Sequence, residues 1–253
     1  MNCRFVFRAV PKYIPYAAAA GLLFKGVSLI REVSNEEHAF DSRFGKRTPG
    51  RPPAGPNYFV NKDGLQIFWR CWFPKDGKPK GIVVLCHGLS EHSGRYDAFA
   101  ASLTKSGFGV YALDHQGHGL SEGDRSYVEK FKDLVQDVLQ FTNIVKGRHI
   151  QLAHRFFLVG HSMGGLIAVH TVLANAQQWA GVVLSAPALK PDPKTSTPFI
   201  KAVARVLSYV FPKLALRKLP LDGLCSDPAV VHNYGACVYG LFVLHLSPFI
   251  LDH

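Results

Sequence analysis

This 253-residue sequence lacks three kinds of pattern, and each absence excludes a class of binding site or partner. The five cysteines form no C-x-x-C pair and have irregular gaps, so neither a zinc site nor a disulfide framework is indicated. There is no P-loop, no dinucleotide-binding fingerprint and no H-E-x-x-H, so we expect no metal ion and no cofactor. No run of five like charges occurs either, and nucleic acid is therefore not an expected partner.

Apolar side chains, by contrast, are abundant. Hydrophobic residues make up 47% of the chain and charged residues 19%, which excludes intrinsic disorder and allows a sizeable core. Lys and Arg number 29 against 18 Asp and Glu, a formal charge of +11 at pH 7. Because this positive charge is dispersed, an anionic membrane surface is a more plausible partner than nucleic acid.

The N-terminal part of the chain is predicted to lie outside the folded core. Residues 1–31 carry basic but no acidic side chains, and Pro15 and Lys25 interrupt their apolar stretch. A membrane-spanning helix needs about 20 apolar residues. We interpret the segment as a targeting or membrane-anchoring one, with mitochondrial targeting or an ordinary packed helix as alternatives. Residues 32–56 have the composition of a linker, and the expected location is intracellular and membrane-associated.

From Asn57 onward, expected strands and helices alternate. A hairpin is expected first, and the later apolar runs indicate further strands and helices in turn. The expected strands are 58–60, 65–73, 81–86, 108–113, 156–159 and 182–184, and the expected helices are 96–105, 128–145 and 164–176. Repeated strand–helix–strand units predict an α/β fold over residues 57–189, with a mainly parallel sheet flanked by helices.

The most informative motif is the G-x-S-x-G at Gly160 to Gly164, between an expected strand and an expected helix. Its glycines permit a sharp turn that holds Ser162 in strained φ/ψ, with its hydroxyl clear of the sheet. Backbone N–H groups at the helix start favour a developing oxyanion. Ser162 is thus a candidate nucleophile, and the N–H groups of Met163 and Leu89 are candidate oxyanion donors. A glycine turn with an incidental serine is the alternative.

Four segments resemble the monoglyceride lipases within the serine α/β-hydrolases, with lysophospholipases as close relatives. They are HGLSEHSGRY, DHQGHGLSEG, GHSMGG and LSAPAL, in that order and spacing, and the resemblance covers about residues 57–235. It implies hydrolysis of monoacylglycerol to fatty acid and glycerol through an acyl-Ser162 intermediate. The substrate partner would be monoacylglycerol or a related lipid ester; the oligomeric state stays open.

The resemblance also assigns roles to other residues. Glu91 and Arg95 would hydrogen-bond the glycerol hydroxyl groups, and residues 190–235 would form a mobile apolar lid that collects lipid from a membrane. Several polar side chains near the site would instead brace its loops or face away from Ser162, namely His87, Asp114, His118 and His161.

The base and acid that a catalytic serine needs do not stand at the family's positions. In this fold the chain order is Ser, then Asp or Glu, then His. The acids and histidines after Ser162 match none of those positions; they are Asp192, Asp222, Asp227, Asp252, His170, His232, His245 and His253. The tail, residues 236–253, departs from the family and is almost wholly apolar.

We therefore expect a lipase-like chain truncated before the triad Asp and His, with the C-terminal strands of the fold missing. For the tail, a lid helix, a membrane-binding segment and altered splicing or reading frame are alternatives. Two further functions stay open: an inactive homologue that binds lipid or membrane, and a lysophospholipase or acyltransferase.

Overall fold

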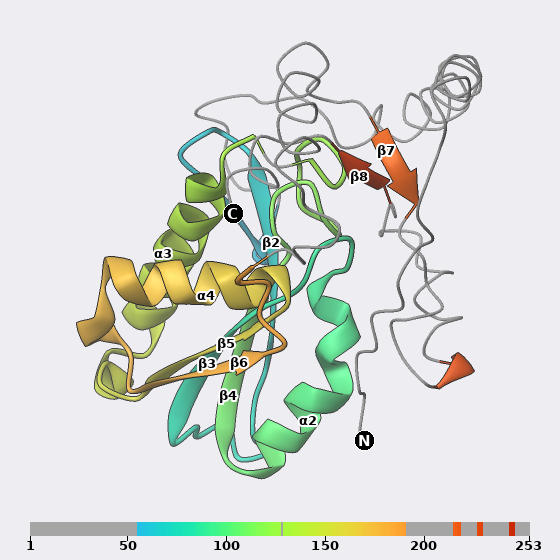
Figure 1. The fold of residues 1–253 in the computed structure, drawn as a ribbon. Coiled ribbons are helices and arrows are strands. Elements are labelled where there is room, and N and C mark those ends of the chain that lie inside the picture. Colours follow the sequence, from blue (N-terminus) through green and yellow to red (C-terminus); the bar gives the residue numbers. More distant parts are fainter. Residues whose placement is uncertain (1–54, 128, 191–214, 219–226, 230–242, 246–253) are drawn as a thin grey trace, which may run out of the picture.

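The structure is a computed structural model that describes residues 55–127, 129–190, 215–218, 227–229 and 243–245. Its main body is a six-stranded sheet with the strand order β1-β2-β4-β3-β5-β6, covered by helices on both faces (Figure 1). The α/β fold with a mainly parallel sheet is therefore confirmed.

The sheet combines an antiparallel side and a parallel side. β1 (Tyr58–Val60), β2 (Gln66–Trp72) and β4 (Phe108–Leu113) pair antiparallel. β3 (Gly81–Cys86) then runs parallel to β4 and to β5 (Phe156–His161), and β6 (Gly181–Ser185) runs parallel to β5. All six residues of β3 are buried, as a strand covered on both faces requires.

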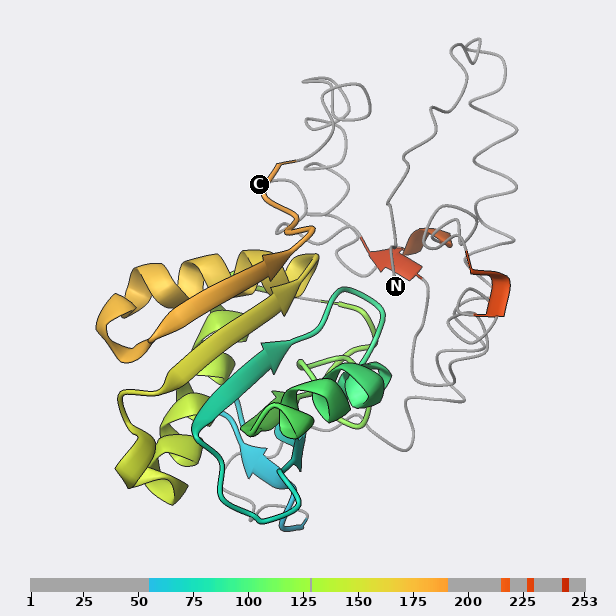
Figure 2. The same cartoon turned by 90° about the horizontal axis from the view of Figure 1, so that it is seen from below.

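Three helices form the two outer layers. α3 (Phe131–Arg148) and α4 (Met163–Ala174) lie side by side on one face, and α2 (Asp97–Lys105) covers the other (Figure 2). Short 3₁₀ turns flank them at Ser93–Tyr96, Ile150–Leu152 and Ala176–Gln178. The expected elements are all present, and their ends differ from expectation by a few residues. α3, for example, begins at Phe131 because Lys130 before it is extended.

The larger part of the core lies between the sheet and the layer of α3 and α4. Phe141 of α3 stacks on Phe59 of β1, with 5.7 Å between ring centroids, and its ring lies 6.0 Å from that of Trp69 in β2. Aromatic pairs at such distances add to the stabilisation from burial alone. The N-terminal hairpin is thereby fixed to α3.

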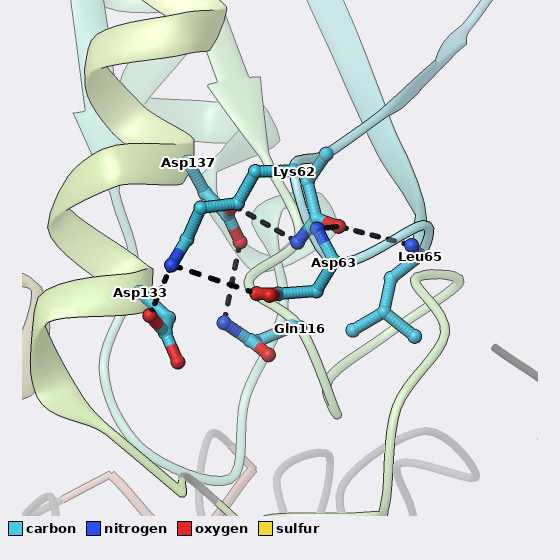
Figure 3. A network of polar contacts seen from close by, with 7 residues as sticks. Lys62, Asp63, Leu65, Gln116, Asp133 and Asp137 are labelled. Carbon is cyan, nitrogen blue, oxygen red and sulfur yellow. Dashed lines mark hydrogen bonds and ion pairs between the residues drawn. The ribbon is translucent and has the colours of Figure 1, made fainter. Parts of the chain in front are cut away.

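A buried polar network makes a second connection between the hairpin and α3 (Figure 3). Asp137 of α3 is fully buried and accepts hydrogen bonds from Asn61 Nδ2 at 3.0 Å and from Gln116 Nε2 at 3.4 Å. Beside it, Lys62 Nζ is 2.7 Å from Asp133 Oδ1. Burial raises the pKa of Asp137 to about 8. Since Gln116 follows β4, this network also fixes the loop at the carboxyl end of that strand.

Among the residues that the structure describes, β6 is the edge strand of the sheet opposite β1. Its residues Val182, Val183 and Leu184 are exposed, Val183 by 57%. Exposed apolar side chains on an unpaired edge are uncommon because such an edge can pair with another chain.

Several predicted segments fall largely outside the described residues. They are the targeting segment 1–31, almost all of the linker, and most of the lid-like region 190–235 and of the tail 236–253. Two strands are described there, β7 (Ala215–Lys218) and β8 (Val243–His245), which pair antiparallel. Within the described ranges, no helix combines the length and the apolar character needed to cross a membrane. The domain boundaries stay predictions.

Candidate active site

Ser162 occupies the sharp turn between β5 and α4 with φ +52° and ψ −116°. A residue other than glycine in such a conformation costs about 1–3 kcal/mol, and it persists only where its surroundings hold it. Here two backbone hydrogen bonds do so. The Ser162 N–H donates to Ser185 O at 3.0 Å, and the Ser162 carbonyl accepts from the Ala188 N–H at 3.0 Å. The strained turn that the sequence predicted is therefore confirmed.

The turn also depends on close backbone approaches that only glycine allows. A Cβ atom built on Gly160 would be 2.3 Å from the Gly164 carbonyl oxygen. One built on Gly164 would be 2.1 Å from the Cys86 carbonyl oxygen, at the end of β3. Neither position can hold a side chain, so the sequence G-x-S-x-G is required by packing as well as by backbone conformation.

The two candidate oxyanion donors lie in segments next to Ser162. Met163 is the first residue of α4, 4% exposed, and a helix leaves the N–H groups of its first turn without intrahelical partners. Leu89 follows Gly88 in the turn after β3, and a Cβ atom built on Gly88 would be 3.3 Å from Ser162 Cβ. The structure thus brings the segments together, and the oxyanion role of both residues stays a prediction.

Glu91 and Arg95 are also neighbours in the structure. Glu91 is 7% exposed, and its Oε2 is 3.3 Å from Arg95 Nε. Its Oε1 accepts hydrogen bonds from the Gly88 N–H at 2.5 Å and from the Tyr96 hydroxyl at 2.6 Å. Burial and the Glu91 charge raise the pKa of Tyr96, so this hydroxyl keeps its proton. No pattern in the sequence predicted the contact of Tyr96 with Glu91, and the glycerol-binding role of Glu91 and Arg95 stays a prediction.

His87 links two loops at the site, as expected of a bracing residue. Its Nε2 accepts from the His115 N–H at 2.9 Å, which leaves the ring proton on Nδ1. Nδ1 therefore donates to the Gly88 carbonyl oxygen at 2.7 Å. His87 thus ties the turn after β3 to the loop after β4.

Asp114 and His118 have bracing roles as well. Buried Asp114 Oδ1 accepts from the Ser93 N–H at 2.8 Å, and its Oδ2 accepts from the Leu120 N–H at 2.9 Å. His118 Nδ1 donates to the Gln116 carbonyl at 3.0 Å when it carries the proton. Burial lowers the pKa of His118 to about 3, so its ring is neutral at pH 7. The prediction that these residues support the loops is confirmed.

No described side chain is hydrogen-bonded to the Ser162 hydroxyl. His161 instead lies 3.2 Å from the Ser185 carbonyl oxygen, and His170 packs edge-on against Phe131 of α3 with 5.0 Å between ring centroids. Asp227 is exposed and accepts from the Ala229 N–H. The other acids and histidines that follow Ser162 fall outside the described residues, except His245 in β8.

The described residues also bear on metal binding and on other nucleophiles. No group of three or more His, Cys, Asp or Glu side chains among them is arranged to hold a metal ion. Cys86 is fully buried, and this burial raises the pKa of its thiol to about 12, so the thiol is not a nucleophile at neutral pH. Ser162 is thus the residue of this region whose geometry suits nucleophilic attack.

Comparison with known proteins places the sheet and its serine turn among hydrolases. Residues 77–237 match the family described as serine aminopeptidase, S33. The monoglyceride lipase of Rattus norvegicus is 33% identical over 211 residues, which cover 79% of this chain and 69% of the relative. The monoglyceride lipase of Homo sapiens is 38% identical over 192 residues, which cover 76% of this chain and 62% of the relative.

Solved structures similar to this chain include lipases as well. The crystal structure of Paleococcus ferrophilus monoacylglycerol lipase is 33% identical with a TM-score of 0.57, covering 71% of this chain and 66% of that chain. A soluble variant of the monoglyceride lipase from Saccharomyces cerevisiae is 22% identical with a TM-score of 0.62, covering 77% of this chain and 65% of that chain, which shows a shared fold. The chain therefore spans about two thirds of the length of each of these relatives.

Proposed function

Because the chain belongs to the monoglyceride lipase-like serine α/β-hydrolases, we propose that it hydrolyses monoacylglycerols to a fatty acid and glycerol. The observation that carries this proposal is the strained turn at Ser162, held at the start of α4 with the Gly88 turn packed against it. Such a turn presents a hydroxyl above the carboxyl edge of the sheet, beside backbone N–H groups.

The reaction proceeds in two steps. Ser162 Oγ attacks the ester carbonyl carbon, its proton passes to a base, and the carbonyl oxygen becomes an oxyanion stabilised by the N–H groups of Leu89 and Met163. The C–O bond to glycerol then breaks, and glycerol leaves with a proton. Water next attacks the acyl-Ser162 carbonyl, which releases the fatty acid and restores the serine. A hydroxyl without a base is a weak nucleophile, so the reactivity of Ser162 has to be measured directly.

A fluorophosphonate probe tests this reactivity because it forms a covalent bond only with an activated serine. We expect labelling of the wild type, labelling of the control Ser106→Ala, and none of Ser162→Ala. Ser106 is a matched control since it is an exposed serine at the end of α2. Release of glycerol from monooleoylglycerol should follow the same pattern. Equal labelling of the wild type and Ser162→Ala contradicts the proposal.

A second candidate is lipid binding without hydrolysis. It is favoured by the absence, among the described side chains, of a hydrogen-bonded base at Ser162. Under this alternative the wild type binds a non-hydrolysable ether analogue of monoacylglycerol yet reacts with no fluorophosphonate probe.

Transfer of the acyl group to an alcohol or hydrolysis of lysophospholipid would use the same acyl-Ser162. Adding glycerol as acceptor, or offering lysophosphatidylcholine as substrate, distinguishes these activities.

Association with an intracellular membrane is part of the proposal. Its support is the formal charge of +11 and the basic, acid-free segment 1–31. Basic side chains near an anionic surface contribute about 1 kcal/mol each. We expect the full chain to sediment with vesicles that contain phosphatidylserine and not with neutral phosphatidylcholine vesicles. Equal sedimentation with both would contradict an electrostatic attachment.

A further inference from the structure

Glu91 makes contacts that its expected role in binding glycerol does not require. Its Oε1 accepts two hydrogen bonds, from the Gly88 N–H at 2.5 Å and from the Tyr96 hydroxyl at 2.6 Å. Its Oε2 pairs with Arg95 Nε at 3.3 Å, which compensates the charge of a carboxylate only 7% exposed. Hydrogen bonds to an ionised acceptor are stronger than those between neutral groups. Both oxygens of Glu91 are therefore already engaged within the protein.

The group that Glu91 holds is the backbone of the turn that lies against the nucleophile. A Cβ atom built on Gly88 would be 3.0 Å from Glu91 Oε1 and 3.3 Å from Ser162 Cβ. Gly88 is thus close to both the Glu91 carboxylate and Ser162. A shift of the turn by a few tenths of an ångström would change its distance to the nucleophile.

The two peptide groups that flank Gly88 are fixed from different residues. Glu91 holds the N–H of the peptide that joins His87 to Gly88. His87 Nδ1 holds the carbonyl of the next peptide, which joins Gly88 to Leu89. In a trans peptide the N–H and C=O point in opposite directions, so fixing the Gly88 carbonyl also sets the direction of the Leu89 N–H. Glycine alone would leave both planes free to rotate.

We propose that Glu91 is a positioning residue that fixes the turn formed by His87, Gly88 and Leu89 against Ser162. This inference rests on the proposed function, because the turn serves the reacting ester carbonyl. The carboxylate acts through the Gly88 N–H. It thereby supports attack on an ester whatever the alcohol part of that ester is.

This role and glycerol binding differ in the substrates they affect. A residue that binds glycerol hydroxyl groups matters for monooleoylglycerol and not for methyl oleate, which lacks them. A residue that positions the turn matters for both esters. Loss of one oxyanion donor costs about 100-fold to 1,000-fold in kcat. We therefore expect Glu91→Ala to lower kcat for both esters by a similar factor of about 100, with KM changed less than threefold.

Two variants accompany this measurement. Glu91→Gln keeps the shape and one acceptor oxygen, so it should recover at least tenfold of the lost kcat on both esters. Asp97→Asn removes a surface carboxylate that accepts from Trp72 Nε1 at the start of α2, and it should behave as wild type. A loss confined to monooleoylglycerol, with methyl oleate hydrolysed at the wild-type rate, would overturn the inference in favour of glycerol binding.

Hydrogen exchange provides a readout that does not require catalysis. In the Glu91→Ala variant, the Gly88 amide should exchange at least tenfold faster than in the wild type, while amides of β3 and β5 keep their protection. In Glu91→Gln, which keeps an acceptor oxygen, the Gly88 amide should exchange more slowly than in Glu91→Ala. Unchanged exchange at Gly88 would overturn the inference. A wild type that hydrolyses neither ester would refute the proposed function instead, and the exchange rates would still decide whether Glu91 holds the turn.

Discussion

Gly88 and Ser162 lie so close together at the ends of two neighbouring parallel strands that a Cβ atom built on Gly88 would be 3.3 Å from Ser162 Cβ. β3 and β5 end side by side in the sheet, so the turn after one and the serine turn after the other occupy the same edge. The site is thus assembled by backbone packing between loops 74 residues apart in the sequence (162 − 88).

This close approach predicts the effect of a small side chain at Gly88. In Gly88→Ala the added Cβ would press on both Ser162 Cβ and Glu91 Oε1, so the turn has to move away from Ser162. Misplacement of a reacting group by about 1 Å can cost 100-fold in rate. We expect fluorophosphonate labelling at least tenfold slower than in the wild type, with an unchanged far-UV circular dichroism spectrum. Labelling at the wild-type rate would show that the turn tolerates the shift.

A second pair of variants tests the packing of the serine turn itself. A Cβ atom on Gly164 would lie 2.1 Å from the backbone oxygen of Cys86, which cannot move without breaking the sheet, so Gly164→Ala should prevent folding. Gly147 in α3 has no atom within 4 Å of a built Cβ, and Gly147→Ala should stabilise the protein by about 0.5–1 kcal/mol. Urea denaturation measures both. Similar midpoints for the two variants would contradict the geometry.

Asp114 should be important for stability. It is fully buried and accepts from Ser93 through one oxygen and from the Leu120 N–H through the other. In Asp114→Asn an amide NH₂ has to face one of these donors, which leaves a buried donor unsatisfied at a cost of about 1–3 kcal/mol. The exposed Asp76, which accepts from the Lys78 N–H in a surface turn, is the control. Asp76→Asn should change the free energy of unfolding by less than about 0.5 kcal/mol. Equal effects would contradict this prediction.

Asp137 predicts how stability depends on pH. Burial raises its pKa from the ordinary 3.8 to about 8 in the folded protein. Between these values the unfolded chain has released the proton and the folded chain keeps it, so raising the pH favours unfolding. The stabilisation that the protonated Asp137 gives the folded state is fully present below pH 4. As the pH rises to about 8, the free energy of unfolding falls by up to about 1.4 kcal/mol per pH unit.

The variant Asp137→Asn removes this titration. Its free energy of unfolding should rise relative to that of the wild type as the pH increases from 4 to 8, measured by urea denaturation at each pH. Asp133→Asn, one turn earlier on the same helix, is the control because its carboxylate is only partly buried. Parallel curves for the wild type and Asp137→Asn would contradict the assignment.

The exposed apolar edge at β6 predicts self-association. Val183 is 57% exposed on this edge strand, and a lysine there would oppose pairing with another chain. We expect Val183→Lys to shift the sedimentation profile toward the monomer at concentrations where the wild type forms larger species. Ala98→Lys, on the exposed surface of α2, adds the same charge elsewhere and should leave the profile unchanged. The prediction fails if the two variants sediment alike.

The fold and the strained turn at Ser162 could be predicted from the sequence because both leave local patterns. The apolar run of β3 and the spacing of Leu134, Val138 and Phe141 in α3 reflect burial directly. The motif around Ser162 is likewise local, since its glycines and serine lie within five consecutive residues. Element ends were less exact because the last residues of a helix depend on capping and tertiary contacts.

The supporting contacts could not be predicted, because single polar residues far apart carry no periodic signal. Asn61 reaches Asp137 across 76 positions, and nothing in either local sequence indicates the other. The sequence predicts Tyr96 only as the start of a helix, whereas its hydroxyl donates a hydrogen bond to Glu91. The resemblance suggested which residues stand near the site, but the direction of each hydrogen bond required coordinates.

The backbone N–H of Ser162 donates to Ser185, the last residue of β6, and its carbonyl accepts from Ala188 three residues later. Ser162 is therefore connected to the chain that leaves the sheet after Ser185. A force applied to that segment, by a ligand or by a surface, would be transmitted through two hydrogen bonds to a residue already under strain. Loosening this attachment would remove contacts that hold φ of Ser162 at +52°, so the strained backbone of this residue could relax without any change to its own side chain.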